Sequence, residues 1–211
     1  MEILKYIFKF FFRIRWWMIG LPLLAGLIAW LLTGNLDKSY DVKTTIYTGI
    51  LTGYNVDASD SRNATVHMSN LMNVITTERT LKAVSIKLLT RCLIYGDPDK
   101  NTSYITAEHF KELQAVVPRE VEALIDRDNE EKTYNNLVAY ERPYANNFIY
   151  GLLNYSHPYF SVPVLSEKIK VAQLYNSDLI EIGYSANDPG IAYNTLEILN
   201  EEFVKQYRDL R

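Results

Sequence analysis

The sequence is poor in the residues that build covalent frameworks and metal sites. Its 211 residues include one cysteine, Cys92, which excludes an intramolecular disulfide. Cys92 lies on the apolar face of an expected helix, and this position favours a role in the core over one as a nucleophile. The three histidines, His67, His109 and His157, are far apart and belong to no His-x-x-x-His or Cys-x-x-Cys pattern. We therefore expect neither a metal site nor a bound cofactor.

Catalytic motifs and an excess of positive charge are also missing. No Gly-rich loop follows an expected strand, and there is no Gly-x-Ser-x-Gly sequence, which argues against nucleotide binding and a hydrolase elbow. The formal net charge of -3 disfavours a nucleic acid partner. The pairs Glu130-Glu131 and Glu201-Glu202 fit solvated helix charges better than a glycosidase dyad. The sequence thus predicts a protein that is not an enzyme.

The longest apolar stretch is Trp16–Leu32, seventeen residues without a charge. As a helix it would be roughly 25 Å long, which is close to the thickness of a bilayer's hydrocarbon core. Trp16, Trp17 and Trp30 lie near its two ends, where indole rings prefer the headgroup layer. We therefore predict a transmembrane helix over residues 16–34. A buried core helix is the alternative interpretation.

The residues that flank this stretch predict its orientation. Four basic residues precede it, among them Arg13 and Arg15, against one acidic residue. By the positive-inside rule, the basic segment 1–15 lies in the cytoplasm and the domain at 35–187 lies in the periplasm, beyond a bacterial inner membrane. A cleaved signal peptide is the competing interpretation, although no small-x-small cleavage site follows Leu32.

The remainder of the chain, roughly 175 residues, is long enough for one globular domain. Apolar and β-branched residues alternate in three segments, and the last two are joined by a turn that predicts a β-hairpin. Apolar residues at helical spacing fill most of the sequence between them. We expect an α+β fold: a membrane-proximal α/β domain with packed helices and a small mixed sheet. Its strands are expected near 40–51, 164–174 and 178–185.

Two helix boundaries carry clear signals. A helical stretch over 65–93 changes its apolar face at Thr77, which can cap a second helix, and His67 belongs to the first apolar face. Asp188 and Pro189 combine a capping carboxylate with proline at the first helical position, so they open the last helix, 188–211. That apolar pattern runs to the end of the sequence without a C-cap, and we expect the start of a longer helix.

The order of these features resembles a known family. A basic N-terminus, one span and a strand precede the bipartite helix NLMNVITTERTLKAVSIKLL, and a hairpin ends in DLIEIGYSANDPGIAYNTLEILN. This order resembles the Wzz-type chain-length determinants, or polysaccharide co-polymerases. The most specific part is a strand followed by Asp-Pro-x-x-Ala, matched here by Ser177–Tyr184 and then Asp188, Pro189 and Ala192. The middle of the chain, Gly96–Pro163, matches only in general character.

The resemblance implies a protein of the bacterial inner membrane that forms a ring-like homo-oligomer in contact with membrane lipid. Such proteins govern the length of O-antigen, capsule or exopolysaccharide chains, and their partners are a separate polymerase and the growing glycan. In the family a second span follows a long helical projection, so we expect this sequence to be an N-terminal portion. A membrane-anchored periplasmic glycan-processing enzyme and a sensor domain are the alternatives.

Overall fold

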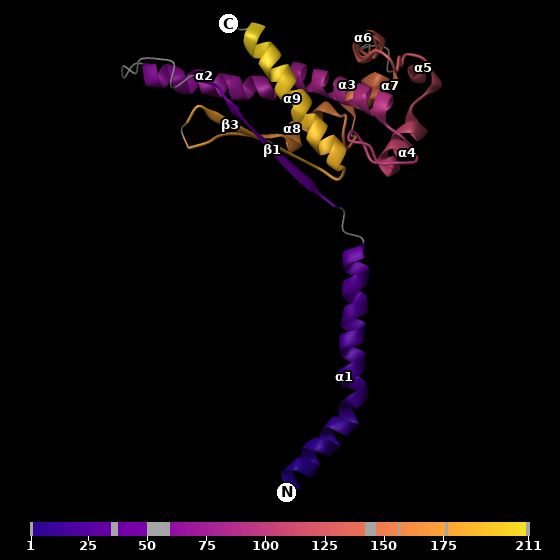
Figure 1. Ribbon diagram of the computed structural model, residues 1–211. Coiled ribbons are helices and arrows are strands. Elements are labelled where there is room, and N and C mark those ends of the chain that lie inside the picture. The colour runs from indigo at the N-terminus through magenta and orange to yellow at the C-terminus, as the bar shows by residue number, and fades with distance from the viewer. Residues whose placement is uncertain are drawn as a thin grey trace. The chain divides into compact units, whose positions relative to one another are not determined.

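The computed structural model describes residues 2–34, 38–49, 60–141, 147–155, 157–175 and 177–209. The chain divides into two compact units, Met1–Lys38 and Ser39–Arg211. The first contains one long helix, α1 (Glu2–Gly34), and the second contains all the described strands and the other described helices (Figure 1). The fold class is α+β, as the sequence predicts.

Helix α1 is continuous, with Pro22 inside it. Its segment Arg13–Leu31 is long and apolar enough to cross a membrane, with a mean hydropathy of 1.6, and no part of this segment is buried within the chain. Large apolar side chains therefore face outward around the helix, among them Leu21, Leu24 and Ile28. A helix of this kind needs lipid or another protein to cover its surface.

The described part of the second unit contains three strands and a larger number of helices. The strands are β1 (Tyr40–Tyr47), β2 (Lys170–Gln173) and β3 (Leu179–Ala186). The helices described are α2 (Asp60–Ile75), α3 (Glu78–Tyr95), α4 (Ala107–Val116), α5 (Arg119–Glu122), α6 (Glu130–Tyr140), α7 (Phe148–Asn154), α8 (Val162–Lys168) and α9 (Pro189–Asp209).

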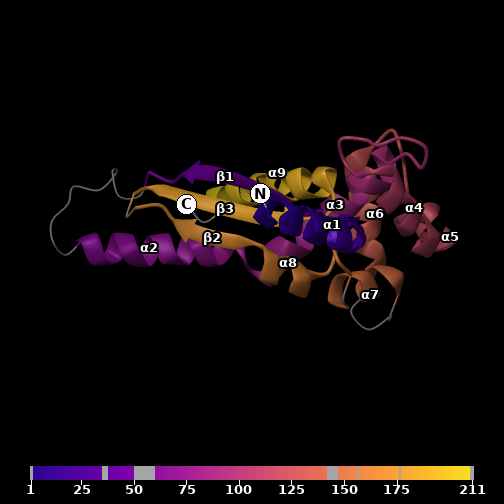
Figure 2. The same ribbon diagram turned by 90° about the horizontal axis from the view of Figure 1, so that it is seen from below.

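The three strands form one antiparallel sheet in the order β1-β3-β2 (Figure 2). Tyr40 pairs with Ala186 at one end of the β1–β3 ladder, and Tyr47 pairs with Leu179 at the other. The predicted hairpin is confirmed, since β2 and β3 pair with each other. The prediction of a mixed sheet is wrong, because both strand pairs are antiparallel.

The predicted strand 164–174 is wrong in its first half. Residues Val162–Lys168 form helix α8, and only Lys170–Gln173 form a strand. Pro163 lies in the first turn of α8, where its fixed φ suits a helix and its missing N–H leaves no bond unmade. Leu165 then enters the core with no exposed surface, which favours the helical conformation over a longer strand.

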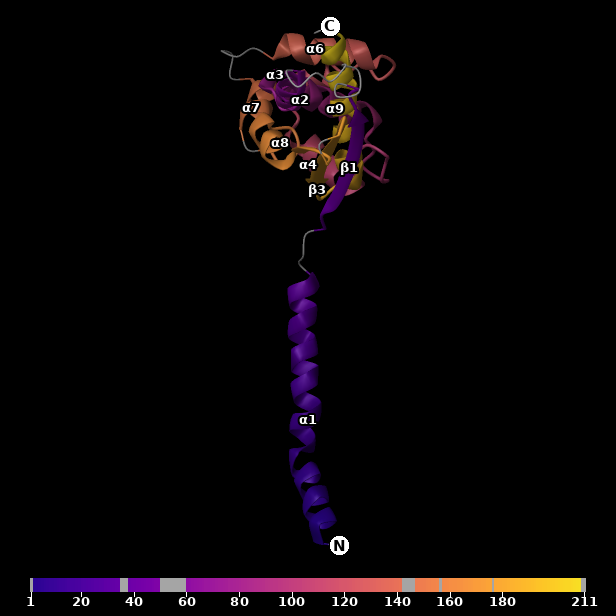
Figure 3. The same cartoon turned by 90° about the vertical axis from the view of Figure 1, so that its left-hand side faces the viewer.

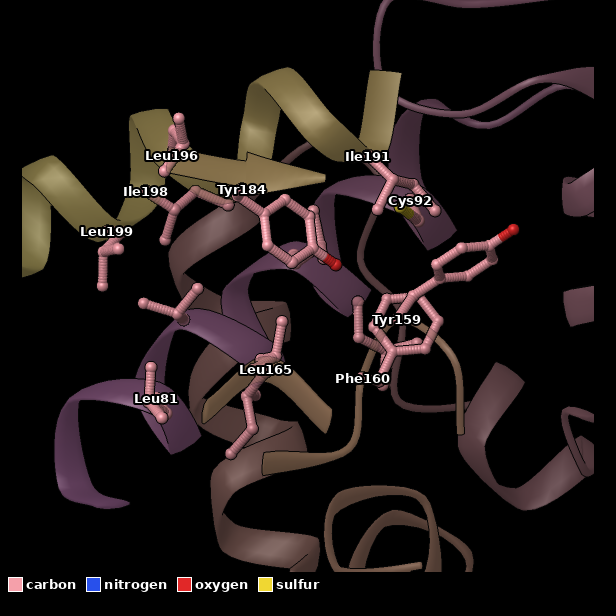
Figure 4. Close-up of a cluster of buried hydrophobic side chains, with 14 of the residues drawn as sticks. Leu81, Cys92, Tyr159, Phe160, Leu165, Tyr184, Ile191, Leu196, Ile198 and Leu199 are labelled. Atoms are coloured by element: carbon pink, nitrogen blue, oxygen red, sulfur yellow. The ribbon is translucent and has the colours of Figure 1, made fainter. Parts of the chain in front are cut away.

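The core lies between one face of the sheet and the paired helices α3 and α9. Along β3, the alternate residues Ile180, Ile182, Tyr184 and Ala186 are buried, as expected for a sheet with one covered face. Helix α9 packs against α3 and against both long strands. Figure 3 shows this arrangement from the side, and Figure 4 shows Tyr184 of the sheet among side chains from α3, α8 and α9.

The bipartite helix is confirmed as α2 and α3. Thr77 is the N-cap of α3, and its hydroxyl accepts a hydrogen bond from the Thr80 N–H at 3.4 Å. Cys92 is fully buried on the inner face of α3, as predicted. The place of His67 in the apolar face of α2 is wrong: His67 is exposed, and the neighbouring Met68 is buried instead. A thioether can leave water without losing hydrogen bonds, whereas an imidazole cannot.

Candidate functional site

The Asp-Pro motif forms the junction between the sheet and the last helix. Strand β3 ends at Ala186, Asp188 is fully buried, and Pro189 is the first residue of α9. The Oδ1 atom of Asp188 accepts a hydrogen bond from the Ile191 N–H at 3.0 Å. The prediction that Asp188 caps this helix is therefore confirmed. Ala192, the last residue of the motif, is buried in the core.

The second carboxylate oxygen of Asp188 holds a segment that is distant in sequence. Its Oδ2 atom accepts hydrogen bonds from the backbone N–H and the hydroxyl of Thr106, at 2.8 and 2.7 Å. His109 Nδ1 lies 2.9 Å from the same oxygen. Thr106 precedes α4 and His109 lies in its first turn, so one carboxylate joins the starts of α4 and α9.

The backbones of the two joined segments also approach each other closely. A Cβ atom at Gly190 would lie 2.6 Å from the carbonyl carbon of Tyr104, a distance that no side chain could tolerate. One turn later, the Asn194 side-chain amide donates to the carbonyl oxygens of Ser103 and Gly190, both at 2.8 Å. We call this set of contacts the α4–α9 junction: residues 103–109 on one side and 188–194 on the other.

Sequence reasoning missed the partners of Asp188 in the junction. Thr106 and His109 lie 82 and 79 residues before it. A local pattern shows that a carboxylate can cap its own helix, but the segment that will occupy its second oxygen depends on how the chain packs. The sequence shows a Thr-x-x-His pair at the start of an expected helix, Thr106 and His109. Such a pair by itself does not predict a contact with a distant carboxylate.

The charge states at the junction follow from burial and hydrogen bonding. Burial raises the pKa of the Asp188 carboxyl, but the hydrogen bonds from Thr106, Ile191 and His109 lower it by more, so this pKa lies below its ordinary value. Burial raises the pKa of the Cys92 thiol, and the Asp188 charge raises it further. Asp188 is thus ionised at neutral pH, and Cys92 is a protonated thiol that is a poor nucleophile.

The Asp188–His109 pair is the part of the junction closest to catalytic geometry. A buried carboxylate that fixes the Nδ1 side of an imidazole occurs in acid–base catalysis, where the Nε2 side does the chemistry. Here the other group bonded to His109 Nδ1 is the Thr106 hydroxyl, at 2.9 Å, and that hydroxyl also binds Asp188. Among the residues described, no three His, Cys, Asp or Glu side chains are placed to hold a metal ion. The contacts of His109 Nδ1 thus join the first turn of α4 to Asp188.

A second polar cluster connects α3, α6 and α9. Arg91 of α3 binds Glu130 of α6 at 3.0 Å, and it binds Glu197 and Glu201 of α9 at 3.1 and 3.2 Å. Beside it, Lys87 lies 2.5 Å from a carboxylate oxygen of the buried Glu202. The glutamates expected to be solvated helix charges therefore include ion-paired groups that hold three helices together.

The predicted membrane-flanking residues all lie on α1, and their side chains are exposed: Arg13, Arg15, Trp16, Trp17 and Trp30. The Arg15 guanidinium lies 6.0 Å from the ring centroid of Trp16, within the range of a cation–π contact. An aromatic ring beside a cation at the end of an apolar helix is typical of the layer between lipid tails and water.

Comparison with protein families, curated proteins and solved structures found no match to this chain. The basis for a functional proposal is therefore the chain itself: an apolar helix, a strand that follows it closely, and the α4–α9 junction. The resemblance described above rests on the order of these features and on the Asp-Pro motif.

Proposed function

We propose that this chain is a non-catalytic subunit of the bacterial inner membrane that regulates the chain length or export of a surface polysaccharide. The polymer would be an O-antigen, a capsule or an exopolysaccharide. The chain acts as an oligomeric scaffold, with the N-terminus of α1 in the cytoplasm and the unit Ser39–Arg211 in the periplasm. Its partners are membrane lipid, further copies of itself, the polymerase and the growing glycan.

The observation that supports this proposal is an apolar helix followed after a few residues by a strand of the sheet, together with the direct connection of that sheet to α9. Helix α1 ends at Gly34 and β1 begins at Tyr40, so five residues connect them. Strand β3 pairs with β1 along its whole length and leads through the buried Asp188 cap into α9. Within the second unit, β1, β3 and α9 are thus joined directly, and a scaffold requires elements joined in this way.

The chemistry of the best-defined site supports a scaffold over an enzyme. Both oxygens of Asp188 are occupied by hydrogen bonds within the chain, and Cys92 is a buried, protonated thiol. The charges of the Arg91 cluster are paired in contacts between helices. In this proposal the protomers pack side by side, and the ring sets the geometry in which the polymerase and the growing chain meet.

The test is a gene deletion followed by analysis of surface glycan on a gel. We expect the length distribution to shift while the total sugar incorporated persists, because the polymerase still acts without its scaffold. A length profile identical to that of the parent strain would contradict the proposal. Release of reducing sugar by the purified chain, lost in the His109→Gln variant, would favour the glycan-processing alternative instead.

A further inference from the structure

A pocket of about 380 Å³ lies among α3, α4, α5 and the turn that leads to α6. Figures 1 and 2 both show α4, α5 and α6 together at one end of the second unit. The volume is within the range of small-molecule sites, about 300–1,000 Å³. Its lining combines four apolar residues with three polar or charged ones. The pocket therefore has the composition of a binding site, an apolar surface with a few polar groups.

The apolar part of this pocket is held in place by the surrounding helices. Three of its residues are buried and the fourth is half-buried: Leu93, Phe110, Val117 and Ile125. A Cβ atom at Gly96 would lie 2.3 Å from the Phe110 ring, so this ring packs directly on the glycine backbone at the end of α3. In the turn after α5, the Leu124 carbonyl accepts a hydrogen bond from the Asn136 side chain of α6 at 3.0 Å. A pocket that is already formed costs less entropy to occupy.

The other lining residues are polar and exposed: Gln114 of α4, Glu122 of α5 and Arg127 of the following turn. Within the described ranges of the chain, no hydrogen bond or ion pair involves the side chains of these three residues. Their neighbours differ, since Lys132 pairs with Asp126 at 2.9 Å and the Tyr140 hydroxyl donates to Glu120 at 3.0 Å. One amide, one carboxylate and one guanidinium at the same pocket are thus available to a ligand.

The two signs of charge at this pocket restrict the chemistry of its ligand. An anion such as phosphate would be attracted by Arg127 and repelled by Glu122, and an organic cation would meet the reverse. An apolar molecule would cover the apolar residues but would displace water from both charged groups without replacing their hydrogen bonds. A hydroxyl group both donates and accepts, so a ligand with several hydroxyls can serve the carboxylate, the amide and the guanidinium together. A sugar has such hydroxyls around a ring whose face consists of C–H groups.

We propose that this pocket binds a sugar unit of a glycan chain. Sugar hydroxyls donate to Glu122, accept from Arg127 and do both with Gln114, while the C–H face of the ring covers the apolar residues. The inference rests on the proposed function for the source of the sugar, and it deepens that function by adding a contact between the scaffold and the growing glycan. One such site binds weakly, with a Kd on the order of 1 mM, and several copies in an oligomer hold one long chain more tightly.

The direct test is saturation-transfer NMR on the purified full chain in detergent micelles. The probe is the mixture of oligosaccharides that mild acid releases from the surface polysaccharide of the parent strain. We expect transfer to the sugar C–H protons, and no transfer at about 10 mM oligosaccharide, well above the expected Kd, would overturn the inference. Free leucine, a zwitterion with an apolar side chain, is the competing probe. Transfer to leucine in place of the sugars would assign the pocket to amino acids and would also overturn it.

Two charge-removing variants locate the binding in this pocket. Arg127→Met and Glu122→Met should each raise the Kd for the oligosaccharides about 10-fold, the loss expected when a charged hydrogen-bonding partner is removed. Both side chains are exposed and without a partner in the described chain, so the fold should keep its unfolding midpoint. The matched controls are Arg119→Met and Glu131→Met, which remove exposed charges from α5 and α6 outside the pocket lining and should leave the Kd unchanged.

The outcomes separate this site from the broader proposal. Oligosaccharide binding that is unchanged in both Arg127→Met and Glu122→Met would overturn the site, whatever the deletion strain shows. If the deletion shifts glycan length but the purified chain binds no sugar, the scaffold function stands and the site does not. If the deletion leaves glycan length unchanged while binding is present and is weakened by both variants, the site stands and the regulation of chain length does not.

Discussion

Asp188 shows how one residue joins two helices. Its carboxylate is fully buried, is ionised, and accepts hydrogen bonds from Thr106, His109 and Ile191. A buried charge costs free energy unless its hydrogen bonds are complete, so its stability contribution depends on all of these partners together.

Asp188→Asn should therefore destabilise the fold. The amide nitrogen of asparagine cannot accept the hydrogen bonds that Oδ2 receives from Thr106, and the helix cap is retained only if the remaining oxygen serves α9. We expect the free energy of unfolding to fall by about 2–4 kcal/mol, measured by denaturant unfolding in detergent. Asp128→Asn, at an exposed loop position, is the matched control and should change it by less than about 0.5 kcal/mol. Equal free energies of unfolding for the two variants would contradict a stabilising role of Asp188 at the α4–α9 junction.

His157 makes the stability of the fold depend on pH. Burial lowers its pKa from 6.5 to about 4, so between these values the unfolded chain binds a proton that the folded chain does not. Stability should fall as the pH decreases from 6.5 to 4, by on the order of 2–3 kcal/mol over this window. His157→Asn keeps an acceptor near the Tyr159 and Phe160 N–H groups and does not titrate. Its unfolding midpoint should therefore depend less on pH, and curves that are parallel to those of the parent would contradict this assignment.

At the scale of secondary structure, local signals predicted the helix starts better than the strands. Thr77 and Asp188 were identified as caps because the capping hydrogen bond is local. The length of β2 and its pairing depend on segments distant in sequence. Residues near Pro163 form helix α8, in which Leu165 is buried. An alternating apolar pattern of a few residues fits both structures, and packing against distant segments decides between them. For the same reason, the sequence predicted the cap at the junction but not Thr106 and His109.

Arg91 is the contact that three helices share. The Arg91 side chain is only 14% exposed, and its guanidinium contacts carboxylates from α6 and α9. Arg91→Met preserves the apolar stem and removes the charge, leaving Glu130, Glu197 and Glu201 close together without their shared cation. We expect a loss of about 1–2 kcal/mol in the free energy of unfolding that shrinks at high salt, since these carboxylates are partly exposed.

The control for Arg91 is Lys100→Met. Lys100 pairs with Asp97 at 3.5 Å, but its side chain is 76% exposed, so its removal should change stability by less than about 0.5 kcal/mol. If Arg91→Met changed the free energy of unfolding as little as Lys100→Met, the Arg91 ion pairs would not stabilise the packing of α3, α6 and α9.

At the scale of the whole molecule, the two units differ in where their apolar side chains lie. The segment Arg13–Leu31 of α1 has no buried part, whereas the second unit buries many apolar residues around α3, α9 and the sheet. The first surface needs lipid or another protein to cover it, whereas the second unit covers its core residues itself. Five residues connect the two units, and in the proposed function the insertion of α1 therefore determines on which side of the membrane the sheet folds.

The excess of basic residues before the apolar segment of α1 predicts on which side of the membrane the second unit lies. Cysteine labelling can test this prediction. Lys38→Cys places a thiol at an exposed position after the apolar segment of α1, and Arg13→Cys places one at the start of that segment. A membrane-impermeant maleimide added to spheroplasts should label the first and reach the second only after lysis, because basic residues stay in the cytoplasm. The native Cys92 is fully buried and should react only after denaturation, so its signal serves as an internal control. The opposite labelling pattern would invert the topology and contradict a periplasmic scaffold. An accumulated product that lacks residues 1–34 but is labelled at position 38 would instead identify the apolar helix as a cleaved signal peptide.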